Sequence, residues 1–194
     1  NPAALPIGFA RHEDQVGPTC AACHTAQINY KGTAMRIDGA PALANVTAFQ
    51  RAIKAALSAT LSDEGKLSRY AKAAHGGSDD TSRAAARKSL TETLAWFDSY
   101  ITANRSSTEE GFARLDAIGR IVNQVIRFTS SPKNSAEPNA PTSFPLLWDA
   151  PRHDYVQWTG FSPNAGARPL GRNVGEVIGV FGHIEVKHYD SQQA

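Results

Sequence analysis

The sequence predicts a mainly α-helical fold with long irregular loops rich in proline and glycine and at most a small hairpin. Two observations support this prediction. Apolar residues recur at helical spacing through four successive segments in the middle of the chain. Proline and glycine interrupt the regions on either side, where they disfavour regular helices. The 194 residues are enough for a sizeable core, and we expect a single domain over residues 1–194.

The N-terminal region is expected to hold only short elements. Residues 1–17 contain several prolines and glycines and are predicted to be irregular. Thr19 is predicted to cap a short helix that carries Cys23 and His24. Residues 28–38 show a weak alternation of apolar and polar residues, with Gly32 and Gly39 as turn residues. This pattern indicates a small hairpin or an extended loop.

Four helices follow, each predicted from a start signal and an apolar stripe. Capping boxes at Thr47 and Ser107 open the first and the fourth helix. The second helix starts at Ser62, followed by Asp63 and Glu64, and stops at Gly76. The third runs from about Ser82 to Asn104. The apolar stripes consist, in chain order, of Phe49, Ile53, Leu57 and Leu61; Leu67, Tyr70 and Ala74; Leu90, Leu94, Phe97 and Ile101; and Leu115, Ile118, Val122 and Val125.

The last third of the chain changes character. Four prolines between residues 132 and 145 exclude a regular helix there. The bulky residues that follow, up to Trp148, indicate an ordered loop packed against a flat surface. In residues 172–182 three glycines stand among apolar residues, a spacing that lets a helix approach another surface closely.

Charge and hydropathy give no signal for two classes of partner. The net charge is +2 and the lysines and arginines form no dense block, so neither nucleic acid nor a membrane surface is an expected partner. The longest apolar runs, such as residues 177–181, are far too short to cross a bilayer.

The most specific chemical signal is the C-x-x-C-H motif of Cys20, Cys23 and His24. In such a motif each cysteine sulfur adds across one haem vinyl group, and the histidine reaches the iron from the proximal side. The motif therefore predicts covalent haem c with His24 as an iron ligand, in a cytochrome c-like domain. A disulfide or a redox dithiol is the alternative interpretation. A zinc site would need further ligands, and the chain has only 2 cysteines.

The haem motif also predicts where the protein is found. Haem is attached covalently on the outer side of the bacterial cytoplasmic membrane. No signal peptide precedes Asn1. We therefore expect a mature exported chain that is periplasmic or secreted.

The sixth position of the iron decides between two functions. A protein ligand there makes an electron carrier, whereas an open position lets dioxygen or peroxide bind. Met35 is the only methionine and is expected at the haem edge or in the core rather than on the iron. His153 and His183 are the other candidate ligands.

Three aromatic residues, Trp148, Trp158 and Phe161, flank the proline-rich loop. They are either core residues or the lining of an apolar distal pocket that excludes water.

Polar residues suggest contacts with the haem edge. Asp116, Arg120 and Asn123 share one helix face, either as an exposed Asp–Arg pair or as a polar edge facing the haem. In the second case Arg120 lies near a propionate and Asn123 near the iron-bound ligand. Arg36 and Arg172 are further propionate candidates, because a guanidinium pairs bidentately with a carboxylate.

Four segments of the chain form a recognisable set. They are CAACHTAQINYKGTAMRIDGAPAL, RLDAIGRIVNQV, APTSFPLLWDAPRHDYVQWTGFSPNAG and RNVGEVIGVFG. The set resembles the N-terminal haem domain of the di-haem proteins related to bacterial cytochrome c peroxidase, in the branch with the di-haem rubber oxygenases and fatty-acid dioxygenases. The similarity covers most of residues 6–182.

The resemblance implies properties that composition does not show. Members are periplasmic or secreted and carry two c-type haems in two domains. In the oxygenase branch the N-terminal haem binds dioxygen. A Trp residue and Phe residues in its distal pocket are important for function there. This role is carried to Trp148 and Phe161 as expected catalytic residues. Asn123, which the helix-face argument places near the iron-bound ligand, is the third expected catalytic residue.

Two features depart from the family pattern. Leu147 stands where the rubber oxygenases have an aromatic residue, which puts rubber cleavage in doubt. The family also needs a second C-x-x-C-H, which residues 1–194 lack. We therefore expect this chain to be the N-terminal half of a two-haem protein, with a second haem c on a separate or missing part.

Two main hypotheses follow. The first is an oxidoreductase, either an oxygenase that cleaves or peroxidises an unsaturated lipid or hydrocarbon, or a peroxidase that takes electrons from a small donor protein. The second is an electron-transfer domain with a six-coordinate iron, ligated by His24 and Met35 or His183. A domain that merely stores haem is a third class without a supporting motif.

Overall fold

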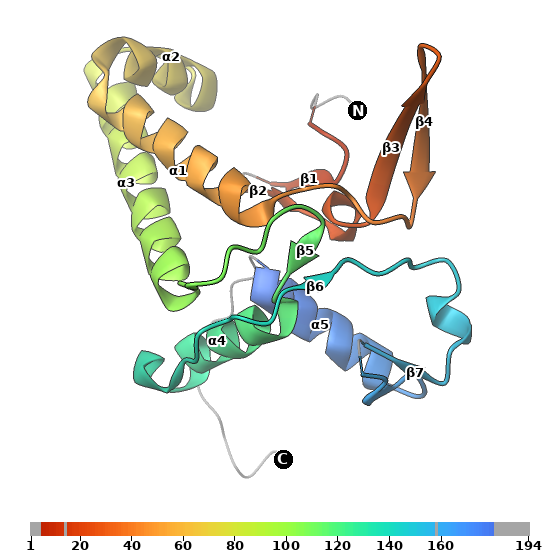
Figure 1. Ribbon diagram of the computed structural model, residues 1–194. Coiled ribbons are helices and arrows are strands. Elements are labelled where there is room, and N and C mark those ends of the chain that lie inside the picture. The colour runs from red at the N-terminus through yellow and green to blue at the C-terminus, as the bar shows by residue number, and fades with distance from the viewer. Residues whose placement is uncertain (1–4, 14, 158, 181–194) are drawn as a thin grey trace. The chain divides into compact units, whose positions relative to one another are not determined.

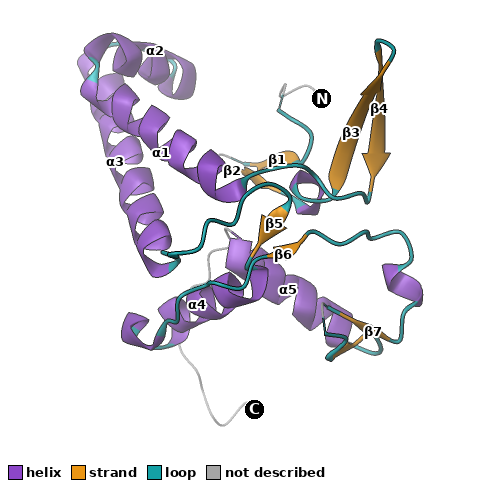
Figure 2. Cartoon of the chain, viewed as in Figure 1, coloured by secondary structure: helices purple, strands orange, loops and turns teal. Residues whose placement is uncertain are grey.

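The computed structural model describes residues 5–13, 15–157 and 159–180 (Figure 1). Within these ranges it contains five α-helices and four two-stranded antiparallel sheets. The helices account for most of the regular structure (Figure 2), which confirms the mainly α-helical class predicted from the sequence.

The chain forms two compact units. One unit comprises the described residues up to Asn45 together with those from Ser106 onward, and the other is Val46–Arg105. The second unit is therefore an insertion in the sequence of the first. The expectation of one domain over residues 1–194 concerns how the two units are joined, and it stays a prediction.

The inserted unit consists of three helices, α1 (Val46–Ser62), α2 (Glu64–His75) and α3 (Asp80–Ala103). Its core lies where α2 and α3 pack together, and α1 adds partly buried side chains to that core. Such burial of apolar stripes supplies most of the stability of short helices. The buried residues of this cluster are Leu67, Ala71, Ala86 and Leu90, with Leu57, Leu61 and Tyr70 packed against them.

Aspartates begin two of these helices. The carboxylate of Asp63 accepts a hydrogen bond from the backbone N–H of Lys66 at 2.8 Å, and Asp79 accepts one from Ser82 at 3.0 Å. Gly76 ends α2 in the left-handed conformation, at φ 79°, which confirms the predicted stop.

Two predicted helix starts in this unit are wrong. Helix α3 begins at Asp80 rather than Ser82, because Asp79 provides the cap and Ser82 serves as its donor. Helix α1 already begins at Val46, so Thr47 lies inside the first turn and not at the N-cap.

The first unit opens with two hairpins. Strands β1 (Phe9–His12) and β2 (Gln15–Pro18) pair with each other, so the prediction that residues 1–17 are irregular is wrong. Strands β3 (Thr25–Tyr30) and β4 (Thr33–Asp38) form the second hairpin, which confirms the hairpin expected at residues 28–38. The short 3-10 helix η1 (Cys20–Ala22) lies between them.

The rest of this unit contains two helices and several short elements. They are β5 (Arg114–Leu115), α4 (Ala117–Thr129), η2 (Pro132–Asn134), β6 (Thr142–Ser143), η3 (Ala150–Arg152), β7 (Tyr155–Val156), β8 (Ser162–Pro163) and α5 (Arg168–Val180). Strand β5 pairs with β6, and β7 pairs with β8.

The fourth helix begins at Ala117, with its N-cap at Asp116 rather than at the Ser107 that the capping box predicts. The carboxylate of Asp116 accepts a hydrogen bond from Gly119 N–H at 2.9 Å and thereby caps α4. Ser107 does not start a helix, and its hydroxyl and backbone N–H instead donate to the carboxylate of Glu137.

Helix α4 presents its polar side to the interior of the unit. Its buried residues are Arg120, Asn123 and Gln124, whereas its apolar stripe of Ile118, Val122 and Val125 is exposed. The polar side binds the irregular segments before and after the helix, as described below. Periodicity predicts which residues share a face, and here the apolar face is the outer one.

Helices α4 and α5 approach each other closely at a glycine. A Cβ atom on Gly179 would lie 2.1 Å from Ile121 Cγ1 and 2.7 Å from Ile121 Cα, so only glycine fits. This contact confirms the close approach expected for the glycine-containing helix. The last of its three glycines, Gly182, lies outside the described residues.

Candidate functional site around His24

The motif residues form a tight turn. The backbone N–H groups of Cys23 and His24 both donate to the carbonyl of Cys20, at 3.2 and 3.0 Å. Both cysteines are free thiols; Cys20 is exposed and Cys23 is half-buried. Burial raises the pKa of the Cys23 thiol, and the neighbouring Cys20 raises it further. The turn therefore holds two thiols close together with one open to solvent.

The turn is held against β1 by Gly8. Thr19 donates to the Gly8 carbonyl from its backbone N–H at 2.7 Å and from its hydroxyl at 3.2 Å. A Cβ atom on Gly8 would lie 2.4 Å from Ala22 Cα. Thr19 occupies the N-cap position of η1, but its side chain makes no capping hydrogen bond, so that part of the prediction is wrong. The 3-10 helix ends at Ala22, before Cys23 and His24.

The imidazole of His24 is oriented by a backbone carbonyl. Its Nδ1 lies 3.1 Å from the oxygen of Pro145. A carbonyl oxygen can only accept, so Nδ1 carries the proton and Nε2 keeps its lone pair. Burial lowers the pKa of His24, while the Pro145 hydrogen bond and the charge of Glu176 act in the opposite direction. The result is a neutral imidazole with one nitrogen available as a ligand.

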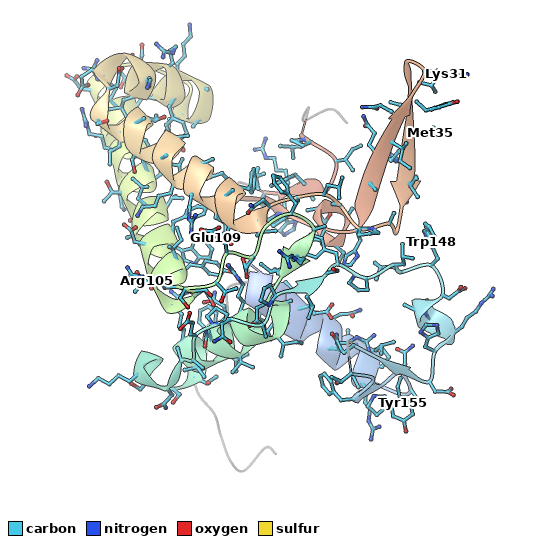
Figure 3. The ribbon with its side chains drawn as sticks, viewed as in Figure 1. Lys31, Met35, Arg105, Glu109, Trp148 and Tyr155 are labelled. Atoms are coloured by element: carbon cyan, nitrogen blue, oxygen red, sulfur yellow. The ribbon has the colours of Figure 1, made fainter. Side chains whose placement is uncertain are left out.

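Backbone hydrogen bonds tie the same segment to the end of the β3–β4 hairpin. Gly39 N–H donates to the carbonyl of His24 at 2.8 Å, and Leu147 N–H donates to the carbonyl of Gly39 at 3.0 Å. The indole Nε1 of Trp148 donates to the carbonyl of Asp38 at 2.7 Å. Trp148 accordingly lies at the C-terminal end of β4 (Figure 3). The loop predicted to pack on a flat surface packs on this hairpin end.

Arg172 has an unused donor. Its Nη2 donates to Asn164 Oδ1 at 3.3 Å, but its Nη1 is buried and has no hydrogen-bond partner among the residues that the structure describes. A buried guanidinium nitrogen without an acceptor is costly, because its hydration is lost and not replaced. A carboxylate that approached Nη1 would satisfy it, which is the chemistry of the haem propionate that the sequence suggests for this residue.

Sequence reasoning missed two linked polar residues: Glu176, whose charge acts on His24, and Gln157, which binds Glu176. Glu176 of α5 is within electrostatic range, since its charge raises the pKa of His24. Gln157 Nε2 donates to Glu176 Oε1 at 2.9 Å, and Gln157 itself has a positive φ of 72°. A non-glycine residue in this conformation is uncommon and worth attention. The one available sequence signal was that Glu176 is the only acidic residue of α5.

Two candidate haem-contacting residues, Arg36 and Met35, lie on strand β4 of the second hairpin. Arg36 Nε lies 3.0 Å from Asp38 Oδ1 on β4, and both side chains are largely exposed. Met35 is 45% exposed and pairs with Ile28 across the hairpin (Figure 3). Their expected roles at the propionate and at the haem edge stay predictions.

Asn123 and Arg120 have protein partners at their polar ends. The Asn123 side chain, 1% exposed, donates to the carbonyl of Ala136 at 2.8 Å and accepts from its N–H at 3.1 Å. Arg120 Nη2 lies 2.7 Å from Glu110 Oε2, with both side chains at most 5% exposed. The suggestion of an exposed Asp116–Arg120 pair is therefore wrong, because both residues are buried. The roles of Arg120 and Asn123 toward a haem stay predictions.

For the remaining candidates, the described part of the structure records no contact with His24. Phe161 is 64% exposed and His153 is also exposed. Trp158 and His183 lie outside the described residues.

Two features are absent from the described part of the chain. No group of three or more His, Cys, Asp or Glu side chains there is arranged to hold a metal ion. None of its helices combines the length and the hydropathy needed to cross a membrane.

Comparisons with known proteins give one relevant relative. Over 94% of its length, this chain is 36% identical to a protein of Sinorhizobium fredii described as uncharacterized protein y4iJ. The match covers 34% of that protein, so the chain spans about a third of the length of the curated relative it matches. No family model matches the chain. No solved structure matches it either.

Proposed function

We propose that Cys20, Cys23 and His24 bind a c-type haem and that this cytochrome c-like chain is part of a periplasmic or secreted oxidoreductase that uses dioxygen or hydrogen peroxide. One observation carries the proposal above the motif itself. The hydrogen bond from His24 Nδ1 to Pro145 fixes the tautomer in which Nε2 is a ligand. A histidine activates a redox dithiol when it is protonated, whereas burial lowers the pKa of His24 and favours the neutral ring.

The residues present fit the group. Each thiol would add across one vinyl group, with sulfur bonding to one carbon and hydrogen to the other, so attachment consumes no oxidant or reductant. Arg172 would pair its free Nη1 with a propionate. When bound, the haem would supply the redox chemistry of dioxygen or peroxide.

The surrounding residues would tune the ligand. The carbonyl of Pro145 favours a proton on Nδ1, which makes Nε2 more basic, and the charge of Glu176 raises the pKa of the ring. Gln157 would hold the carboxylate of Glu176 in one orientation through its 2.9 Å hydrogen bond. In this proposal the exposed ring of Phe161 lines the distal side.

We also propose that a second haem-bearing part completes the protein, as in the di-haem family that the sequence resembles. The relative is about three times as long as the region that matches this chain, which leaves room for such a part. The exposed apolar stripe of Ile118, Val122 and Val125 on α4 also suits coverage by a partner.

The first test is covalent attachment. The chain would be produced in a bacterial periplasm together with haem-attachment proteins, and its mass and colour measured after denaturation. We expect the mass of one haem to be added and the colour to persist. Cys20→Ala with Cys23→Ala serves as the control and should yield colourless protein. A wild-type chain that carries a disulfide and no haem would support the dithiol interpretation instead.

The second test separates an oxidoreductase from an electron carrier. Carbon monoxide or cyanide added to the purified holoprotein should shift its optical spectrum quickly if the sixth position is open. A spectrum that does not shift, but does shift in Met35→Leu, would assign the iron's second axial ligand to Met35. That result would favour the electron-transfer alternative.

A further inference from the structure

We propose that Trp148 is a positioning residue behind His24, on its Nδ1 side, and that Gly39 is the seat that admits its indole ring. The inference rests on the proposed axial role of His24. It replaces the expectation, derived from the resemblance, that Trp148 lines the distal pocket.

The first argument is a closed circuit of hydrogen bonds. His24 contacts Pro145 through Nδ1, and the chain runs on from Pro145 to Leu147. Leu147 N–H donates to Gly39, and Gly39 N–H donates back to His24. The ligand and the carbonyl that orients it therefore belong to one ring of contacts. We call these four residues, with Trp148 and Asp38, the His24 bracket.

Trp148 adds a second tether beside this ring of hydrogen bonds. Its Nε1–H donates to the carbonyl of Asp38, the residue before Gly39, at 2.7 Å. The two tethers, from Leu147 to Gly39 and from Trp148 to Asp38, join adjacent residues of one segment to adjacent residues of the other. Two such tethers resist rotation of the Pro145 segment, whereas one alone would act as a pivot.

Gly39 makes this arrangement possible in two ways. Its φ of +80° favours glycine. A Cβ atom at this position would lie 2.7 Å from Trp148 Cδ1 and 2.9 Å from Nε1, well inside contact distance. The indole ring thus lies on bare backbone, which explains how Trp148 reaches Asp38 although it remains 59% exposed.

The placement gives the side of the imidazole on which the bracket lies. The Pro145 carbonyl is at Nδ1, while a bond to iron would come from Nε2, across the ring. Because Leu147 and Trp148 continue the segment of Pro145, they are anchored on the side away from the metal bond. Loosening Trp148 should weaken the Nδ1 hydrogen bond and make Nε2 a poorer donor.

The test compares three variants of the holoprotein. Trp148→Phe keeps a ring and removes the N–H, and Gly39→Ala pushes the indole off its seat. The matched control is Gly32→Ala, because Gly32 has the same φ of +80° with no atom near its missing Cβ. The measurements are the midpoint reduction potential and the iron–histidine stretching frequency of the ferrous form.

We expect Trp148→Phe and Gly39→Ala to raise the potential and lower the stretching frequency, and Gly32→Ala to change neither. A weaker Nδ1 hydrogen bond stabilises the oxidised iron less, which gives these signs. The inference is overturned if Trp148→Phe alters cyanide or carbon monoxide affinity while potential and stretching frequency stay at wild-type values. That outcome would place Trp148 on the distal side.

A separate readout distinguishes this inference from the haem proposal. In the chain purified without haem, the indole N–H of Trp148 should exchange slowly with solvent in wild type and Gly32→Ala and quickly in Gly39→Ala. If no haem attaches but this protection pattern holds, the bracket exists and the haem proposal fails. If haem attaches and the indole N–H exchanges freely in wild type, the bracket is wrong and the haem proposal stands.

Discussion

At the scale of single residues, the buried polar side of α4 contacts the carboxylate of Glu110. It accepts from Arg120 Nη2 at 2.7 Å, from Arg120 Nε at 3.2 Å and from the backbone N–H of Asp116 at 3.1 Å. A buried charge is tolerated only when its partners replace the lost water, and here three donors do so. The pair joins the segment before α4 to the helix itself.

Removing one charge of this pair should be costly. We expect Arg120→Met to lower the free energy of unfolding by roughly 3–5 kcal/mol, because it leaves the Glu110 carboxylate buried without its counter-ion. Urea denaturation followed by circular dichroism measures the change. The double variant Arg120→Met with Glu110→Gln should lose clearly less. A double variant as unstable as the single one would show that the loss comes from packing rather than from the stranded charge.

The sequence predicts these residues only in part. The spacing of Asp116, Arg120 and Asn123 correctly puts them on one face, because helical geometry is local. Their partners, Glu110 and the backbone of Ala136, stand in irregular segments whose path is set by tertiary contacts. Spacing therefore indicated a shared face and could not indicate that this face is the buried one.

At the scale of elements, helix starts show how local signals compete. The start of α2 near Asp63 and its end at Gly76 could be predicted from the sequence, because each residue is a strong local signal at its boundary. At the start of α3, Asp79 and Ser82 both suit a cap, and the carboxylate takes the position. The β1–β2 hairpin went unpredicted because its turn has Glu13 at a positive φ of 54°, where a glycine would have marked it.

The packing of α5 against α4 gives a prediction with an internal control. Gly179→Ala should destabilise the protein by about 1–3 kcal/mol, since the added methyl group collides with Ile121. Gly171→Ala in the same helix meets no atom of the described residues within 4 Å of its Cβ, and it should instead stabilise the protein by about 0.5–1 kcal/mol. Thermal unfolding of both variants checks the opposite signs. Equal effects would mean that α5 does not approach α4 at Gly179.

At the scale of the whole molecule, the candidate site is assembled from distant parts of the chain. The contact between His24 and Pro145 spans 121 positions, and that between Asp38 and Trp148 spans 110. The C-x-x-C-H motif identifies Cys20, Cys23 and His24 as site residues because the three lie within five consecutive positions of the sequence. No local pattern could pair Pro145 with His24, since that pairing depends on how the chain returns after the inserted unit.

Acid should destabilise the folded chain through its capping carboxylates. Hydrogen bonds from backbone N–H groups lower the pKa of Asp63 and of Asp79, and bonds from Ser107 lower that of Glu137. A folded-state pKa below the unfolded value means that the unfolded chain binds more protons as pH falls. The stability these groups contribute is therefore present above about pH 4 and is lost as pH falls through their folded pKa values.

The variant Asp63→Asn with Asp79→Asn isolates this effect in the inserted unit. Asparagine caps a helix about as well as aspartate but does not titrate, so the variant should melt close to wild type at pH 7. Aspartate titrates at about pH 5 to 3. Over this range the melting temperature of the variant should fall less than that of wild type. Scanning calorimetry at several pH values follows both. Parallel curves for the two proteins would show that acid acts elsewhere, which leaves Glu137 and the first unit as the origin of the loss.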